Sequence, residues 1–245
     1  MESWHNIVKL NTINSTNDYT SNILNREKLP EGSIIFTPNQ TNGKGLAFNK
    51  WESEAFKNIT LSLVLYPNFL HVASQFQLSK AISLGIVDYC NRYSEDIQIK
   101  WPNDIYYQEK KLAGILIENT IKGFNIERSI VGIGFNLNQE LFVSDAPNPV
   151  SLKQITNKLF DVEDEILLLR ESIKKYYTRL QSNPNSLDQE YLSKLYRFNE
   201  FRKYKVDNKL VEAKIIGVNE FGYLQTIFTD GQKKEFDLKE IEFVL

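Results

Sequence analysis

The stretch from Gln40 to Trp51 reads QTNGKGLAFNKW and directly follows a short apolar run at residues 34–36. Glycines on both sides of Lys44 allow backbone N–H groups to approach an anion closely, while the lysine supplies positive charge. The stretch is therefore a candidate cradle for a phosphate or a carboxylate. It lacks the G-x-x-x-x-G-K-[ST] spacing of a Walker loop, and a mobile turn explains an isolated G-K-G equally well.

A second group of polar residues occurs in the stretch IQIKWPND, residues 97–104. If Ile97 and Ile99 point to the core, Lys100 lies at the strand end on the opposite face, where a buried ammonium is costly without an anionic partner. The simpler interpretation of this segment alone is a solvated lysine followed by an Asx turn at Asn103 and Asp104.

A third segment, VGIGFNLN at residues 131–138, is an apolar strand with glycine at alternate positions. Glycine weakens a strand, so Gly132 and Gly134 indicate close approach by a ligand or by another backbone. Plain strand packing is the alternative.

A mixed domain of helices and strands must position these segments. Apolar runs at 34–36, 59–65, 97–100, 112–118 and 130–136 predict strands of one mixed sheet, because Asn, Gly and Pro bound them. Apolar residues at helical spacing over 72–93 and 166–180 predict two helices, the second packed on the sheet by one face. The polar run QSNPNS at 181–186 ends this part of the pattern.

The pattern becomes all-β from about Phe198 onward. Several short strands spaced in this way predict a small SH3-like barrel, and hence two domains at residues 1–197 and 198–245. Asp230-Gly231 between alternating runs indicates a hairpin with a type I′ turn, which needs positive φ at both central residues. A packing module with no site of its own is an equal alternative for this domain.

The composition limits the class of protein. A chain of 245 residues with 42% hydrophobic and 24% charged residues predicts a folded protein, and a net charge of -2 argues against a dedicated nucleic-acid binder. The single cysteine, Cys90, excludes an intrachain disulfide, and with only His5 and His71 no zinc site can form from Cys and His ligands. There is neither a signal-like leader nor a run of about 18 apolar residues, so we expect a cytoplasmic protein with no membrane partner.

Taken together, the motifs resemble those of biotin protein ligases, which attach biotin to biotin-dependent carboxylases. The motifs are, in order, Ser15-Thr16-Asn17, QTNGKG at 40–45, KWPND at 100–104, KLAGILIE at 111–118 and GIGFN at 132–136. The resemblance covers nearly the whole chain, and it implies an α+β fold with a mixed-sheet catalytic domain of the biotin/lipoate ligase type and a small C-terminal SH3-like β-barrel.

The resemblance implies that biotin and ATP, with Mg²⁺ on the ATP phosphates, form biotinyl-5′-AMP and pyrophosphate. Biotin then passes to one lysine of a biotin carboxyl carrier protein or domain. Two anions must meet in one pocket, so fixed cations and N–H donors are needed. The implied catalytic residue is Lys100. The implied biotin-binding residues are Ser15, Thr16, Asn17, Gln40, Gly43, Lys44, Gly45, Trp51, Lys100, Ile105, Gly114 and Leu116, and the implied ATP-binding residues are Lys44, Asn103, Lys111 and Asn136.

The sequence departs from the family pattern at two places. Leu46 occupies a position where the family often has arginine, and Phe48 and Asn49 replace a later pair, so a bidentate phosphate clamp is missing unless Lys50 compensates. The end of the chain, EIEFV at 240–244, lacks the terminal arginine of some members, so we expect no nucleotide contact from the β domain.

Two alternatives stay open: a lipoate-protein ligase, which shares the adenylation chemistry, and a non-catalytic peptide-binding module. The first motif lies close to Met1, so we expect a ligase without the helix-turn-helix domain and repressor function of some relatives. An exposed sheet edge could support a homodimer.

Overall fold

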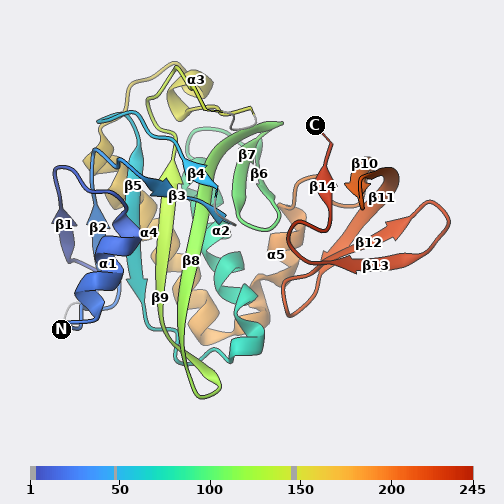
Figure 1. Ribbon diagram of the computed structural model, residues 1–245, viewed down its shortest axis with the longest axis horizontal. Coiled ribbons are helices and arrows are strands. Elements are labelled where there is room, and N and C mark those ends of the chain that lie inside the picture. The colour runs from blue at the N-terminus through green and yellow to red at the C-terminus, as the bar shows by residue number, and fades with distance from the viewer. Residues whose placement is uncertain (1–3, 47–48, 145–147, 245) are drawn as a thin grey trace.

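The computed structural model describes residues 4–46, 49–144 and 148–244. Its largest element is a seven-stranded sheet in the order β1-β2-β5-β9-β8-β7-β6 (Figure 1). Strand β1 pairs with β2 in parallel and all other neighbours are antiparallel, which confirms the predicted mixed sheet. The strands are β1 (Ile7–Lys9), β2 (Ile34–Phe36), β5 (Ile59–Leu65), β6 (Ile97–Lys100), β7 (Asp104–Tyr107), β8 (Lys110–Lys122) and β9 (Asn125–Phe135).

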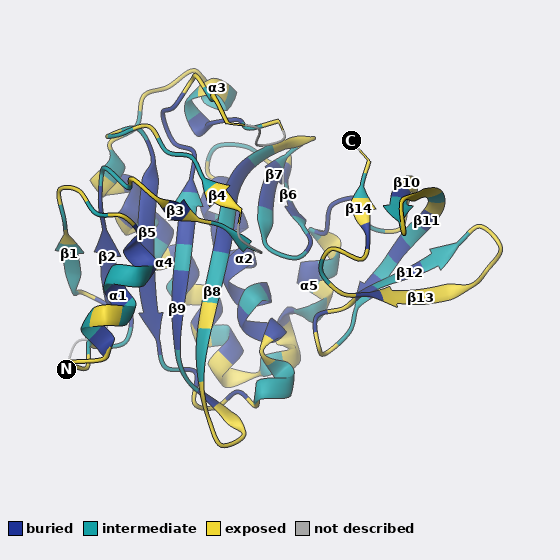
Figure 2. Ribbon diagram, in the orientation of Figure 1, coloured by how far each residue is buried: buried dark blue, intermediate teal, exposed yellow. Residues whose placement is uncertain are grey.

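Both faces of this sheet are covered. Helices α2 (Phe76–Cys90) and α4 (Val162–Ser182) lie on one face, and helix α1 (Thr16–Leu24) lies on the other, beside the hairpin of β3 (Gly43–Lys44) and β4 (Lys50–Trp51) (Figure 1). Strand β5 is consequently buried at every position (Figure 2). Its alternate residues Ile59, Leu61, Leu63 and Leu65 join the main core with α2 and α4, whereas Val64 joins a smaller cluster with Leu24 of α1. The alternation of side chains along β5 therefore places them in two different cores, one on each face of the sheet.

The two long helices differ in how well the sequence predicts them. Helix α4 begins after Asp161, whose carboxylate accepts hydrogen bonds from two first-turn N–H groups, and it buries Ile166, Leu169 and Ile173 as predicted. Helix α2 is shorter than the predicted 72–93, because residues 72–74 form a separate 3₁₀ turn before Phe76. Gly85 of α2 lets α4 approach closely, since a Cβ there would lie 2.7 Å from the Cα of Ile173.

Shorter elements complete the chain around these layers. They are the 3₁₀ turns η2 (Val72–Ser74) and η3 (Pro184–Leu187) and the helices α3 (Leu152–Thr156) and α5 (Asp188–Ser193). No helix in the described part of the chain is both long and apolar enough to cross a membrane.

The C-terminal residues form a small antiparallel sheet in the order β13-β12-β11-β10-β14, which confirms the predicted small β domain. Its strands are β10 (Phe201–Val206), β11 (Lys209–Val218), β12 (Leu224–Phe228), β13 (Lys233–Phe236) and β14 (Glu242–Phe243). The domain is joined to the large sheet by more than the connecting chain. The indole N–H of Trp101 donates to the Gly222 carbonyl at 2.8 Å, and Ile99 and Leu224 belong to one continuous hydrophobic cluster.

The turn between β12 and β13 differs from the predicted type I′. Of the pair Asp230-Gly231, only Gly231 has a positive φ, 86°. The Gly231 N–H donates to the Phe228 carbonyl at 3.0 Å, and the Phe228 N–H donates to the Gln232 carbonyl at 2.9 Å. The loop is thus longer than two residues, and a left-handed glycine closes it.

Candidate functional site

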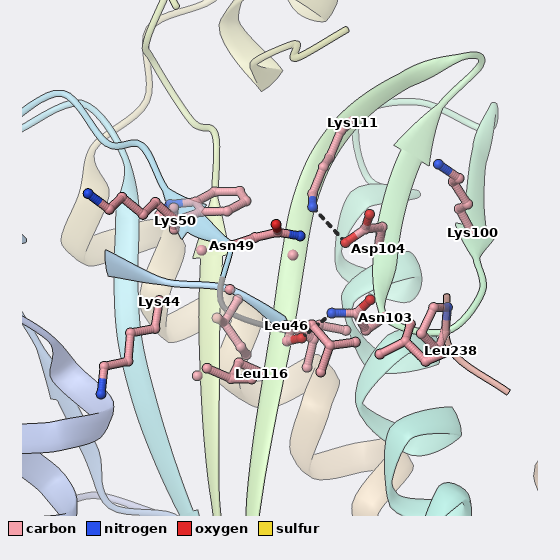
Figure 3. Close-up of a pocket in the computed structure, with 18 of the residues that line it drawn as sticks. Lys44, Leu46, Asn49, Lys50, Lys100, Asn103, Asp104, Lys111, Leu116 and Leu238 are labelled. Carbon is pink, nitrogen blue, oxygen red and sulfur yellow. Dashed lines mark hydrogen bonds and ion pairs between the residues drawn. The ribbon is translucent and has the colours of Figure 1, made fainter. Parts of the chain in front are cut away.

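A cavity of about 400 Å³ opens on the face of the large sheet that carries α1 and the β3–β4 hairpin (Figure 3). It brings together most of the residues implied by the sequence motifs, from elements far apart in the chain. Those that line it are Ser15, Thr16, Asn17, Gln40, Lys44, Gly45, Trp51, Lys100, Asn103, Lys111, Gly114 and Leu116. Leu46, Asn49 and Lys50 of the hairpin line it as well, whereas Phe48 lies outside the described residues.

Three implied residues do not line this cavity. Ile105 is fully buried in the main core, because Asp104 before it points to the cavity and successive residues of a strand face opposite sides. Asn136 is buried, and its amide donates to the carbonyls of Lys111 (3.3 Å) and Val150 (3.2 Å), so it ties two loops together. Gly43 is buried against Gln40, where a Cβ would lie 2.6 Å from the side-chain nitrogen. The structure gives these three residues supporting contacts instead of a place in the wall.

Hydrogen bonds fix the start of helix α1 at one end of the cavity. Ser15 caps the helix, and the Thr16 N–H donates to Oε1 of Gln40 at 2.9 Å. The amide of Asn17 donates to the Glu118 carboxylate at 2.7 Å and accepts from the Ser62 hydroxyl at 2.5 Å. Glu118 and Ser62 therefore orient Asn17 and hold α1 against strands β8 and β5.

The glycines of β8 and β9 form a floor for two side chains. A Cβ at Gly132 would lie 2.6 Å from Oδ1 of Asn17, and a Cβ at Gly134 would lie 2.2 Å from the Trp51 ring. Gly114 is the cross-strand partner of Gly134, and its Cβ would lie 3.1 Å from the same ring. Close approach does occur at Gly132 and Gly134, but the approaching groups are side chains of this protein and not the expected ligand or second backbone.

Two lysines with different surroundings occupy the opposite part of the cavity. The Lys111 ammonium pairs with Asp104 at 2.7 Å, whereas Lys100 forms no ion pair with any described residue. Nζ of Lys100 donates to the Tyr106 hydroxyl at 3.0 Å. Burial lowers the pKa of Lys100, and the neighbouring positive charge of Lys111 adds to that effect while Asp104 opposes it. Lys100 is thus half-buried at the cavity wall instead of extending freely into solvent.

The lysines of the β3–β4 hairpin do not join this pair. Lys44 pairs with Asp18 of α1 at 2.6 Å, and this hydrogen bond raises the pKa of Lys44. Figure 3 shows Lys44 and Lys50 directed away from Lys100. The positive charge that Lys44 was expected to supply to the cradle is therefore already paired with Asp18 in this structure.

The Asx turn expected as the simpler interpretation at Asn103 and Asp104 is also replaced by longer-range contacts. The Asn103 amide donates to the Ile115 carbonyl at 2.6 Å, which fixes the loop after β6 onto β8. Asp104 is engaged by Lys111, as Figure 3 shows. Both residues remain at the cavity wall.

One wall of the cavity was not predicted from the sequence. It consists of C-terminal residues, namely Leu238, Lys239, Ile241, Glu242 and Phe243. No motif marks them, because they reach the cavity only through the pairing of β14 with β10 and through the contact of Trp101 with Gly222. The β domain therefore contributes to the wall of the cavity, although no nucleotide contact was expected from its sequence.

The fold and this cavity define a class of protein. Residues 10–136 match the Biotin/lipoate A/B protein ligase family, and the chain belongs to that family. Among curated relatives, the bifunctional ligase/repressor BirA of Bacillus subtilis is 32% identical over 156 residues, which are 62% of this chain and 45% of that protein. The chloroplastic biotin–protein ligase 1 of Arabidopsis thaliana is 27% identical over 242 residues, 91% of this chain and 62% of that protein. The chain spans about half the length of the curated relatives it matches.

Solved structures support the fold over the whole chain. The biotin protein ligase from Aquifex aeolicus in complex with biotin and ATP superposes with a TM-score of 0.80 at 24% identity, covering 97% of this chain and 98% of that one. The mixed sheet together with the small C-terminal β domain is thus the fold of that protein too.

Proposed function

We propose that this protein is a biotin protein ligase, which forms biotinyl-5′-AMP from biotin and ATP and transfers biotin to a lysine of a biotin carboxyl carrier protein. One observation carries the proposal. A single cavity joins a cluster of hydroxyl and amide groups at the start of α1 to an ammonium group, Lys100, that has no carboxylate partner among the described residues. The first end suits a neutral polar ring and the second suits an anion.

Biotin would bind with its ureido ring at the α1 end. Ser15, Thr16 and Gln40 offer donors and acceptors to the ureido N–H and C=O groups, which must be paired once they leave water. Trp51 on its glycine floor and Leu116 offer apolar contact to the thiophane ring and the valeryl chain. The carboxylate would then point toward Lys100.

ATP would place its phosphates beside Lys100, Lys111 and Asn103. A Mg²⁺ ion would enter with ATP, since no group of three or more His, Cys, Asp or Glu in the described ranges could hold a resident metal. Asp104 and Glu242 are the carboxylates at the cavity wall that could reach such an ion directly or through water. When bound, Mg²⁺ neutralises charge on the phosphates.

Lys100 would act in both steps. In the first, a biotin carboxylate oxygen attacks the α-phosphorus and pyrophosphate leaves, and the ammonium stabilises the charge that develops between the two anions. In the second, the acceptor amine attacks the biotinyl carbon, loses a proton, and releases AMP. An amide bond forms, and the bond between the acyl carbon and the phosphate oxygen in the mixed anhydride breaks.

The two alternatives predict different substrates. Lipoate has no ureido group. A site with buried donors and acceptors for a ureido group should therefore discriminate against lipoate by a factor of ~10⁴ or more. Calorimetric titration with biotin and with lipoate separates the two ligases. A peptide-binding module would release no pyrophosphate with biotin, ATP and Mg²⁺. The decisive experiment is mass spectrometry of a carrier domain after incubation, which should reveal one biotin on one lysine.

We also propose an oligomeric state and a cellular location for this protein. Strand β1 is an edge of the large sheet, and the homodimer prediction rests on that edge. Light scattering of the purified protein measures the oligomeric state. We place the reaction in the cytoplasm, where ATP is supplied, and fractionation of cells tests this placement.

A further inference from the structure

Lys100 is held between the two parts of the molecule. Its ammonium donates to the hydroxyl of Tyr106 on β7, at 3.0 Å, and lies 5.1 Å from the ring centroid of Phe243 on β14. Tyr106 belongs to the large sheet and Phe243 to the small C-terminal sheet. We propose that Phe243 is a positioning residue for Lys100, and that Tyr106 and Phe243 together form a clamp that aims the ammonium at the substrate anions.

Phe243 is well fixed although β14 has only two residues. It pairs with Tyr204 of β10, and the two rings meet edge to face at 5.2 Å. The ring of Tyr196 lies 6.2 Å away on another side and itself contacts Tyr106 at 5.6 Å. The buried guanidinium of Arg197 donates to the carbonyl of Val244 at 2.8 Å. The backbone is therefore held in place directly after Phe243, at Val244.

The clamp leaves Lys100 able to bind an anion. An ammonium has three N–H donors, and the Tyr106 hydroxyl takes one of them. The face of an aromatic ring attracts a cation without accepting a conventional hydrogen bond, so Phe243 stabilises the charge while two donors stay available. A carboxylate in the same place would compete with the substrate anions, as Asp104 does for Lys111.

The role of Phe243 rests on the proposed function, but the contact can be tested without it. In Phe243→Leu the apolar cover over Lys100 remains and the ring face is lost. The charged ammonium then loses a favourable contact while its desolvation stays, so the pKa of Lys100 should fall by about 0.5 or more. Competitive labelling of lysines with trace acetic anhydride as a function of pH, followed by peptide mass spectrometry, measures this pKa in the free protein.

Phe228→Leu is the matched control. Phe228 lies in the same small sheet and also faces a lysine, since Nζ of Lys234 is 5.5 Å from its ring, but it does not line the cavity. Phe228→Leu should leave the pKa of Lys100 unchanged, and Phe243→Tyr should restore the wild-type value. A pKa of Lys100 that is unchanged or raised in folded Phe243→Leu would overturn the clamp.

A second measurement follows the reaction. In biotin-dependent exchange of pyrophosphate into ATP, Phe243→Leu should lower kcat about 3- to 30-fold with little change in the KM for biotin, and the alkaline limb of kcat should move to lower pH. Unchanged kcat and pH limb would also refute the positioning role. If the wild-type protein shows no exchange, the proposed function fails, while the labelling experiment still decides whether Phe243 holds Lys100.

Discussion

Trp51 rests directly on the backbone of Gly134, so closely that a Cβ atom at that position would lie 2.2 Å from the indole ring. The cross-strand neighbour Gly114 extends the same flat floor. The place of the indole in the cavity is therefore set by the absence of side chains on two adjacent strands.

Gly134→Ala should displace Trp51 and weaken biotin binding. Loss of the apolar contact should cost ~1–2 kcal/mol, which is about a tenfold rise in Kd by calorimetry. Gly114→Ala provides a graded control, because its Cβ would lie 3.1 Å from the ring and needs a smaller shift. Equal Kd values in the wild type and a folded Gly134→Ala protein would show that Trp51 is not part of the biotin wall.

Lys100→Ala should abolish most of the activity and leave the fold intact. Loss of a fixed charge at a developing anion typically lowers the rate ~10²–10³-fold. The measurement is biotin-dependent pyrophosphate exchange, with circular dichroism as the check on folding. Lys50→Ala is the control, because that side chain points away from Lys100 (Figure 3) and its loss should change the rate far less. Near-normal turnover by folded Lys100→Ala would remove Lys100 from the mechanism.

The rate should fall at a lower pH than it would if Lys100 had the pKa of an ordinary lysine. Burial lowers the pKa of Lys100, so the cation is present below that pKa and is lost as pH rises through it. In Lys100→Arg the guanidinium stays charged over this pH range. The rate of this variant should be lower, but it should not fall at alkaline pH. A pH-rate profile of the adenylation step measures both, and an identical alkaline limb in the two proteins would assign the titration to another group.

Leu46→Arg should slow the dissociation of biotinyl-AMP. A guanidinium offers a bidentate contact to the adenylate phosphate, and Lys44 is already engaged by Asp18. Filter capture of radiolabelled intermediate compares the release rates, with Leu46→Met as a control of similar size and no charge. Unchanged or faster release in Leu46→Arg would mean that the hairpin already neutralises the phosphate in the loaded enzyme.

Glu118→Ala should weaken biotin binding without removing any group that touches biotin. The mutation frees the amide of Asn17, which now donates to that carboxylate at 2.7 Å, and loosens the start of α1. We expect a rise of about tenfold in the Kd for biotin, from loss of a charge-assisted hydrogen bond of ~1.5–3 kcal/mol partly offset by water. Glu127→Ala, whose carboxylate meets the exposed Lys122, is the control on the same hairpin. Equal Kd values in both variants would make the Glu118 contact structural only.

The sequence predicted the structure best where a local pattern determines which side chains are buried and where the backbone is closely approached. Alternation placed Ile97 and Ile99 in the core and hence Lys100 on the cavity side, and glycine at alternate positions of β9 indicated close approach at Gly132 and Gly134. The same alternation argues against Ile105 as a wall residue, because it follows Asp104 directly.

Contacts between distant residues were not predictable from local patterns. No pattern in the sequence near Lys44 predicts that it pairs with Asp18, because that ion pair depends on how α1 packs against the hairpin. Phe243 reaches Lys100 only because β14 pairs with β10 and the small sheet docks on Trp101. Such tertiary placement requires the complete fold.

The wall formed by residues 238–243 has a consequence for protein synthesis. The cavity is lined by residues from Ser15 to Phe243, so a chain still being translated carries the α1 end of the site long before it carries the last wall. The strands of the large sheet end at Phe135, so all of them precede this wall in the chain, and without the wall the site is open on the side of Lys100. Fragments that end before Phe243 would therefore lack one wall of the cavity and the aromatic ring beside Lys100.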